Sequence, residues 1–138
     1  IRAFADAGRG GNPAGVVLDA DHYSTAQKQR IAAKVGLSET AFVSRSNVAD
    51  IKLEFFTPNR QIAQCGHATV ATFALLRRLG RIAGERSSME NSDGVRSVFL
   101  SGDRVFMEQR GPVYTGLNHE RAAFLQALNL KSEDLMPD

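Results

Sequence analysis

The chain of 138 residues has room for one domain with a hydrophobic core, and two domains would be a tight fit. Its hydrophobic content of 43% and charged content of 23% are typical of soluble globular proteins. Basic residues exceed acidic ones only by 17 to 15 and are scattered, so we expect no nucleic-acid partner. The single cysteine excludes an internal disulfide, and no apolar run approaches the roughly 18 residues of a membrane span. We therefore expect a cytoplasmic protein without a membrane partner.

The first half of the sequence predicts short strands around one helix. Ser24 is a suitable N-cap for a helix over residues 25–35, and Gly36 is a suitable stop. Residues 6–13 are rich in glycine and predict a loop, and because a strand rather than a helix follows them, they do not form a dinucleotide-binding motif. The predicted strands of this half are residues 1–4, 14–18, 39–44 and 51–57.

The second half centres on a helix from Gly66 to about Leu79. Its apolar and small residues fall on all sides, with no charge before Arg77, which is typical of a helix buried all round. Asn118 is the expected cap of an amphipathic helix over 120–128. Further strands are predicted at 86–90, 95–100 and 104–109. Together these patterns predict an α+β domain, in which a curved, barrel-like mixed β-sheet wraps around a central buried helix and a second helix lies outside.

The start of the central helix is the most informative segment. Residues 65–69, Cys-Gly-His-Ala-Thr, place small residues in the first helical turn. A helix start presents free backbone N–H groups and the positive end of the helix dipole, so it suits a carboxylate as well as a phosphate. The only cysteine, Cys65, and the imidazole of His67 add groups that can move a proton. The segment therefore predicts a reactive site for a small acid.

Each candidate proton carrier also has a structural interpretation. Glu39 shares a strand face with Ala41 and Val43 and would project inward at the sheet edge, as a general acid or base, or remain a solvated strand-start residue. His67 is either a neutral hydrogen-bonding group at the site or a satisfied, half-buried histidine. Cys65 is either an activated thiol or inert packing.

Two other chemistries fit less well. One cysteine and three widely spaced histidines do not make a metal ligand set, so we expect no metal. A thiol hydrolase built on Cys65 and His67 is disfavoured, because residues two apart at a helix start usually point in different directions and no third, orienting group is evident.

Five segments occur together in the order and spacing of a known family. They are Gly11–Leu18, Leu37–Val43, Phe56–Pro58, Cys65–Thr69, and Met107–Gln109 with Pro112. On these motifs the chain resembles the PhzF-like family of phenazine biosynthesis, within the diaminopimelate-epimerase superfamily. The resemblance covers residues 1 to about 112.

The resemblance implies a cofactor-independent isomerase or epimerase that shifts a proton next to a carboxylate, in a cleft between two similar domains. Glu39 would be the principal acid/base, and His67 would orient or share the proton. A cysteine at the place of Cys65 is a catalytic base in the superfamily's amino-acid epimerases, but the glutamate takes the leading part in PhzF-like proteins, so Cys65 would rank second. The backbone amides of Gly66, Ala68 and Thr69 would hold the substrate carboxylate, and Asn12 would help line the cleft.

Length is the main departure from that family, whose enzymes are about twice as long. We expect residues 1–128 to form the N-terminal domain and 129–138 to form a linker toward an absent second domain. A complete site would then need a second domain from the remainder of the protein, from another chain or from a self-dimer. The alternative function is a non-catalytic small-acid-binding or interaction module, whose uncovered face would favour oligomers.

Overall fold

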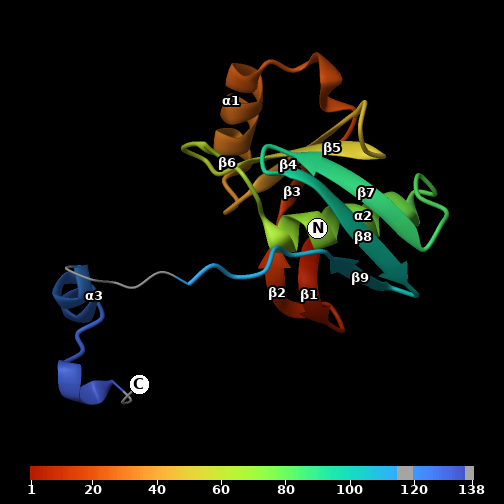
Figure 1. Ribbon diagram of the computed structural model, residues 1–138. Helices are drawn as coiled ribbons and strands as arrows, with labels where there is room; N and C mark the ends of the chain where they lie inside the picture. The colour runs from red at the N-terminus through yellow and green to blue at the C-terminus, as the bar shows by residue number, and fades with distance from the viewer. Residues whose placement is uncertain (115–119, 136–138) are drawn as a thin grey trace.

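The computed structural model describes residues 1–114 and 120–135. Its seven-stranded sheet consists of β3 (Gly15–Val17), β4 (Thr40–Ser44), β5 (Ile51–Phe56), β6 (Gln61–Ile62), β7 (Arg86–Asn91), β8 (Gly94–Ser101) and β9 (Arg104–Met107). The strands follow the order β3-β4-β5-β7-β8-β9, and β6 pairs with β5. The β3–β4 and β5–β7 pairs are parallel and the others are antiparallel. The sheet curls around helix α2 (Gly66–Arg78), which confirms the predicted fold class (Figure 1).

Helix α2 is held in the curve of the sheet by its apolar side chains. Phe73 is fully buried and belongs to one core cluster with Leu53 and Phe55 of β5 and Met89 of β7. The buried threonines of the helix satisfy their hydroxyls internally, since each donates a hydrogen bond to the carbonyl four residues earlier. Because α2 packs against the strands on nearly every side, its first turn is held in a fixed position relative to them.

Helix α1 (Thr25–Val35) covers the opposite, outer face of β4 and β5. Ser24 and Gln27 form a reciprocal capping box at its start, and Gly36 ends it with a φ of 67°. Phe42 and Phe56 pack beneath it, edge to face, with ring centroids 5.3 Å apart. Before α1, the chain makes the short 3₁₀ helix η1 (Ala20–His22).

The glycine-rich segment near the start of the chain is a hairpin, so the predicted loop over residues 6–13 is wrong. Strands β1 (Arg2–Asp6) and β2 (Arg9–Pro13) pair antiparallel in a sheet of their own, and both contact α2. Gly11 adopts a φ of +72°, and a Cβ atom there would lie 2.4 Å from the carbonyl oxygen of Ala3. Glycine thus permits the two strands to approach each other here.

The C-terminal part of the described chain contains α3 (Arg121–Ala127) and the 3₁₀ helix η3 (Ser132–Asp134). No residue of α3 is buried: Phe124, within the helix, is 48% exposed, and Leu128, which follows it, is 65% exposed. The predicted cap, Asn118, lies outside the described residues. Across residues 1–114 and 120–135, none of the helices has the length and apolar character needed to cross a membrane.

Candidate active site

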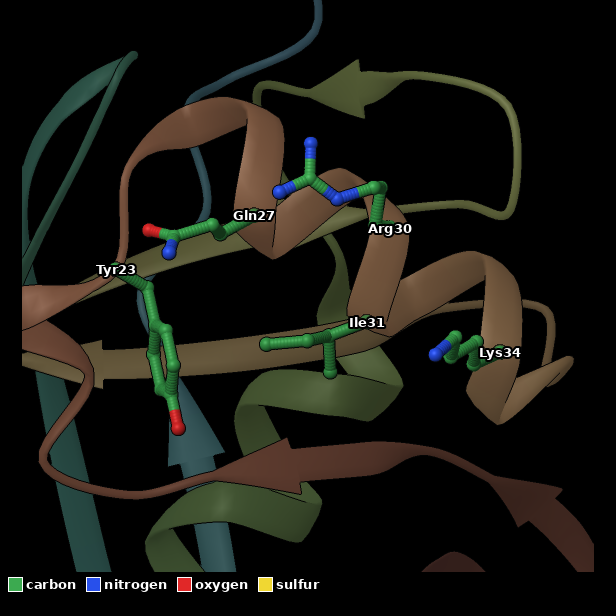
Figure 2. Close-up of a pocket in the computed structure, with 5 residues that line it drawn as sticks. All are labelled: Tyr23, Gln27, Arg30, Ile31 and Lys34. Atoms are coloured by element: carbon green, nitrogen blue, oxygen red, sulfur yellow. The ribbon is translucent and has the colours of Figure 1, made fainter.

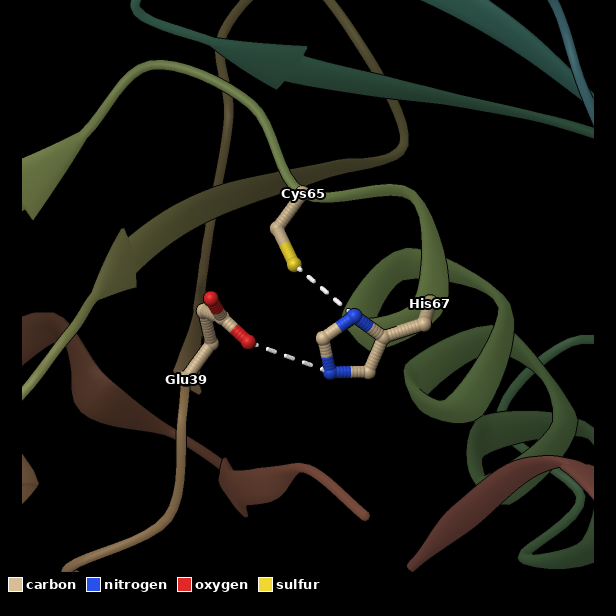
Figure 3. A group of neighbouring side chains, drawn as sticks. All are labelled: Glu39, Cys65 and His67. Atoms are coloured by element: carbon tan, nitrogen blue, oxygen red, sulfur yellow. Dashed lines mark hydrogen bonds and ion pairs between the residues drawn. The ribbon is translucent and has the colours of Figure 1, made fainter. Parts of the chain in front are cut away.

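Glu39 is placed by its position immediately before β4. Its backbone carbonyl accepts a hydrogen bond from the Gly15 amide at 3.0 Å, which ties this point to β3. Within β4, Ala41 and Val43 face the core around α2, whereas Phe42 faces α1. Glu39 lies on the same face as Ala41 and Val43. Its side chain is 20% exposed and points to the start of α2 (Figure 3). The inward projection predicted for this carboxylate is confirmed.

The His67 ring lies between Glu39 and Cys65 (Figure 3). Its Nε2 atom is 3.2 Å from Oε2 of Glu39, and its Nδ1 atom is 3.4 Å from the Cys65 Sγ atom. The expectation that the side chains of Cys65 and His67 diverge, without a third group, is therefore wrong. Cys65 precedes the helix in an extended conformation, with a φ of −149°, and this turn in the backbone directs its thiol back toward the imidazole.

The Glu39–His67 contact is shielded from water. The histidine side chain is 12% exposed, and both contacting atoms are buried without a hydrogen bond among the described residues, to each other included. Polar atoms in such a place are expensive to leave without a partner, so the close electrostatic contact stabilises the position of each group. The pair is thus a preorganised arrangement of a carboxylate and an imidazole.

Burial raises the pKa of the Cys65 thiol above its ordinary value of 9.0. The backbone amides of Ala68 and His67 act in the opposite direction, and the nearby charge of Glu39 raises the pKa further. At neutral pH the thiol is therefore protonated. This protonation state suits a proton donor better than a nucleophile.

Glu39, Cys65 and His67 offer one potential metal ligand each, with ligand atoms within 4.8 Å of one another. However, the carboxylate and the thiol face different nitrogens of the imidazole ring. A carboxylate and a thiol on the two sides of one imidazole ring form a chain along which a proton can move.

The first turn of α2 does not offer all the groups predicted to hold a carboxylate. Gly66 is exposed, which leaves its backbone accessible, and Ala68 is fully buried. Thr69 donates both its amide and its hydroxyl to the carbonyl of Cys65, at 3.1 and 2.8 Å. Its donors are already engaged in the helix start. Asn12 is exposed on β2 and is not part of the group around His67.

The sequence reasoning missed an amide pair beside the site. Gln64 immediately precedes Cys65, and its side chain donates a hydrogen bond to that of Gln109 at 3.1 Å. Gln109 and Gly66 also line a hollow of about 290 Å³. Gln109 was noted only as part of a motif, and no periodicity in the sequence brings it next to Gln64.

A second hollow, of about 260 Å³, lies beside α1 and is lined by Tyr23, Gln27, Arg30, Ile31 and Lys34 (Figure 2). Its lining contains two cations but no acid–base pair. Because α1 and α2 cover opposite faces of β4, this hollow is separated from the Glu39–His67 pair by the sheet.

The chain matches the family model described as phenazine biosynthesis-like protein (PhzC-PhzF) over residues 1–137. The chain belongs to this family. A relative from Bacillus subtilis, named uncharacterized isomerase YfhB, is 36% identical over 99% of this chain and 48% of its own length. The trans-2,3-dihydro-3-hydroxyanthranilate isomerase of Pseudomonas chlororaphis is 34% identical over 94% of this chain and 48% of its own length. The predicted family is thus confirmed, and these relatives are named as isomerases.

Solved structures of PhzF proteins share the fold. A phenazine biosynthesis protein of the PhzF family from Bacillus anthracis superposes with a TM-score of 0.78 at 34% identity, over 98% of this chain and 47% of the other. A predicted epimerase from Pseudomonas aeruginosa, 20% identical, shares the fold with a TM-score of 0.74, over 97% of this chain and 50% of the other. The chain spans about half the length of the curated relatives it matches, which is consistent with a second PhzF-like domain.

Proposed function

We propose that this chain is the proton-transferring half of a cofactor-independent isomerase or epimerase acting next to the carboxylate of a small acid. The observation that carries the proposal is the shielded 3.2 Å contact between Glu39 and His67 at the first turn of α2. It combines a carboxylate able to take a proton with a ring that orients it. The neighbouring helix start supplies positive potential for an anion.

In the proposed reaction, Glu39 removes a proton from the carbon next to the substrate carboxylate. The electron pair of the broken C–H bond moves into the carboxylate as an enolate-like charge, which the accessible amide of Gly66 and the α2 dipole would stabilise. The proton then returns to another carbon or to the opposite face of the same carbon. No redox cofactor is required, because no electrons leave the substrate.

The other residues would support this step. His67 would orient the Glu39 carboxylate and share its proton. Cys65, kept protonated by burial, would act as a secondary proton donor through the imidazole. Thr69 would fix the Cys65 carbonyl instead of touching the substrate, and Asn12 would line the approach to the cleft.

The opposite wall of the site would come from a second PhzF-like domain, in the remainder of the protein, in another chain or in a self-dimer. A proton shift between two faces needs an acid and a base on opposite sides of the substrate. Glu39 and His67 lie on one side only, which supports a site completed by that second domain.

Proton exchange tests the proposal directly. The whole gene product that contains this chain would be incubated in deuterated water with a panel of small carboxylic acids. The panel would include trans-2,3-dihydro-3-hydroxyanthranilate, which the Pseudomonas relative is named for. Loss of the proton NMR signal next to the carboxylate is the expected result for at least one acid. The exposed carboxylate variant Glu85→Gln should exchange normally, and Glu39→Gln should not.

Binding without exchange would overturn the enzymatic proposal in favour of a small-acid-binding module. In that case the same acids would raise the melting temperature of both the Glu39→Gln variant and the unaltered protein. No deuterium would enter any of the acids.

A further inference from the structure

Three different kinds of metal ligand meet at the first turn of α2. Glu39 offers a carboxylate oxygen, Cys65 a sulfur and His67 a ring nitrogen, and one such atom from each residue lies within 4.8 Å of the other two. Glu39 precedes β4, whereas the other two residues open α2, so the sheet and the helix bring the three together. The sequence alone predicted no metal, because the single cysteine and the histidines show no ligand spacing. The fold therefore supplies a ligand set that sequence spacing does not reveal.

The spacing of the thiol and the imidazole matches that of two ligands on one ion. Zinc lies about 2.3 Å from a cysteine sulfur and about 2.0–2.1 Å from a histidine nitrogen, so a tetrahedral site separates these two ligand atoms by about 3.5 Å. The Sγ atom of Cys65 and the Nδ1 atom of His67 are 3.4 Å apart. An ion can therefore bind both atoms without a large movement of either side chain.

The carboxylate of Glu39 is placed to become the third ligand. The carboxylate and the thiol both approach the edge of the His67 ring that carries its two nitrogens (Figure 3). Oε2 of Glu39 lies 3.2 Å from Nε2 and makes no hydrogen bond among the described residues, so it loses none by turning toward the thiol. Because all three ligand atoms already lie within 4.8 Å of one another, closing them around an ion takes movements of roughly 1 Å.

The chemistry and the surroundings of these ligands favour zinc over harder ions. A sulfur and an imidazole nitrogen suit Zn²⁺, whereas Mg²⁺ and Ca²⁺ prefer ligand sets made of oxygens. Cys65 is 8% exposed and the His67 side chain is 12% exposed, so little water screens the attraction between the ion and its ligands. Three protein ligands leave a fourth position, which a water molecule or the carboxylate of a small acid can fill.

We propose that Glu39, Cys65 and His67 form an inhibitory zinc site. Binding replaces the thiol proton, which passes to solvent as the Zn–S bond forms, and no electrons are transferred. The ion then occupies the carboxylate and the imidazole to which the proposed function assigns proton transfer, so these groups cannot take a proton from the substrate. The binding of zinc stands on the geometry alone, and only the inhibition rests on the proposed function.

Cobalt(II) tests the metal site without any substrate, because a cobalt–thiolate bond gives a strong charge-transfer band in the near ultraviolet. The whole gene product would be titrated with Co²⁺ and then with Zn²⁺. The charge-transfer band should appear as cobalt binds and disappear as zinc displaces it. A titration that never produces this band would overturn the proposal.

Substitutions assign the band to the three ligands. Cys65→Ser should lack the band, and Glu39→Gln should keep it with an affinity for cobalt that is weaker by about tenfold or more. His22→Asn, which removes an exposed histidine on η1, is the matched control and should behave like the unaltered protein. A band that persists in Cys65→Ser would come from another part of the gene product and would also overturn the proposal.

The inhibition is tested in the proton-exchange assay. At the concentration that displaces cobalt, Zn²⁺ should abolish deuterium uptake into the responsive acid, whereas Mg²⁺ should not, and removal of zinc with EDTA should restore the uptake. Exchange that continues or accelerates with zinc bound would show that the ion is no inhibitor. If no acid exchanges its proton even without zinc, the proposed function has failed and the inhibition with it, whereas the cobalt titration still decides whether the metal site exists.

Discussion

His67 contacts Glu39 and Cys65 through opposite nitrogens of one ring, at 3.2 and 3.4 Å. A neutral imidazole has one N–H donor and one acceptor nitrogen. With the proton on Nε2, the N–H side of the ring lies beside the Glu39 carboxylate while Nδ1 can accept from the protonated Cys65 thiol. The contact between His67 and Glu39 is a close electrostatic contact and lacks hydrogen-bond geometry. When Glu39 gains a proton, protons can therefore shift between Glu39, His67 and Cys65 without any of these side chains changing position.

The first prediction concerns His67. Replacing it with Asn removes the ring that orients Glu39, so proton exchange in the proposed substrate should slow by about 100-fold or more. The loss should appear in kcat rather than in KM, because the helix-start amides remain. Exchange kinetics in deuterated water measure it, with His22→Asn, an exposed histidine on η1, as the control. Equal rates for the two variants would show that His67 has no part in the transfer.

The second prediction concerns the ionisation of Cys65. Burial and the charge of Glu39 both raise the pKa of this thiol above 9.0. Alkylation by a small reagent should therefore be slow at pH 8 and accelerate only above pH 9. Glu39→Gln removes one cause, so its rate profile should shift to lower pH. Because the folded-state pKa is raised, the thiol's contribution to stability is present below the unfolded pKa and is lost as the pH rises through the folded one. A profile that is unchanged in Glu39→Gln would contradict the coupling.

The third prediction concerns Asp50, which joins the segment before β5 to β7. Its Oδ2 atom accepts hydrogen bonds from the Ser88 amide at 2.8 Å and from the hydroxyls of Ser87 and Ser88 at 3.0 and 3.1 Å. These bonds, the Ser88 amide first, hold the pKa of Asp50 below 3.8. Asp50→Asn should therefore destabilise the protein at pH 7, by about 1 kcal/mol.

The pH dependence of Asp50→Asn follows from the direction of that shift. A carboxylate whose folded-state pKa is depressed contributes stability above the unfolded value of 3.8, and this contribution is lost as the pH falls through the folded value. Melting temperatures of the variant and the unaltered protein should converge as the pH falls below the folded-state pKa of Asp50. A gap that persists at low pH would mean that the carboxylate charge is not the cause.

How far the sequence predicts this structure depends on the range of the interactions involved. The apolar alternation of Ala41, Phe42 and Val43 correctly assigned the two faces of β4, and hence the inward direction of Glu39. Helix α2 was evident from composition alone. The contact of Cys65 with His67 was missed because it depends on the extended backbone at Cys65, which a helical spacing rule ignores. The pairing of Gln64 with Gln109 was missed because it joins distant segments.

The last prediction concerns the β1–β2 hairpin, a pair of strands whose glycines predicted a loop. Gly10 and Gly11 both have positive φ, at +63° and +72°. A Cβ atom at Gly10 would meet nothing within 4 Å beyond the adjacent residues, whereas one at Gly11 would lie 2.4 Å from the carbonyl oxygen of Ala3. Gly10→Ala should therefore cost only the left-handed strain, about 1–2 kcal/mol.

Gly11→Ala should cost distinctly more than Gly10→Ala, because the strands must separate to admit the methyl group. Denaturant unfolding measures both free energies, and hydrogen exchange at Ala3 and Ala5 reports whether the hairpin itself has opened. Since β1 contacts α2, Gly11→Ala should also loosen that contact. Equal destabilisation by the two variants would mean that the close approach of Gly11 to Ala3 does not hold the strands together.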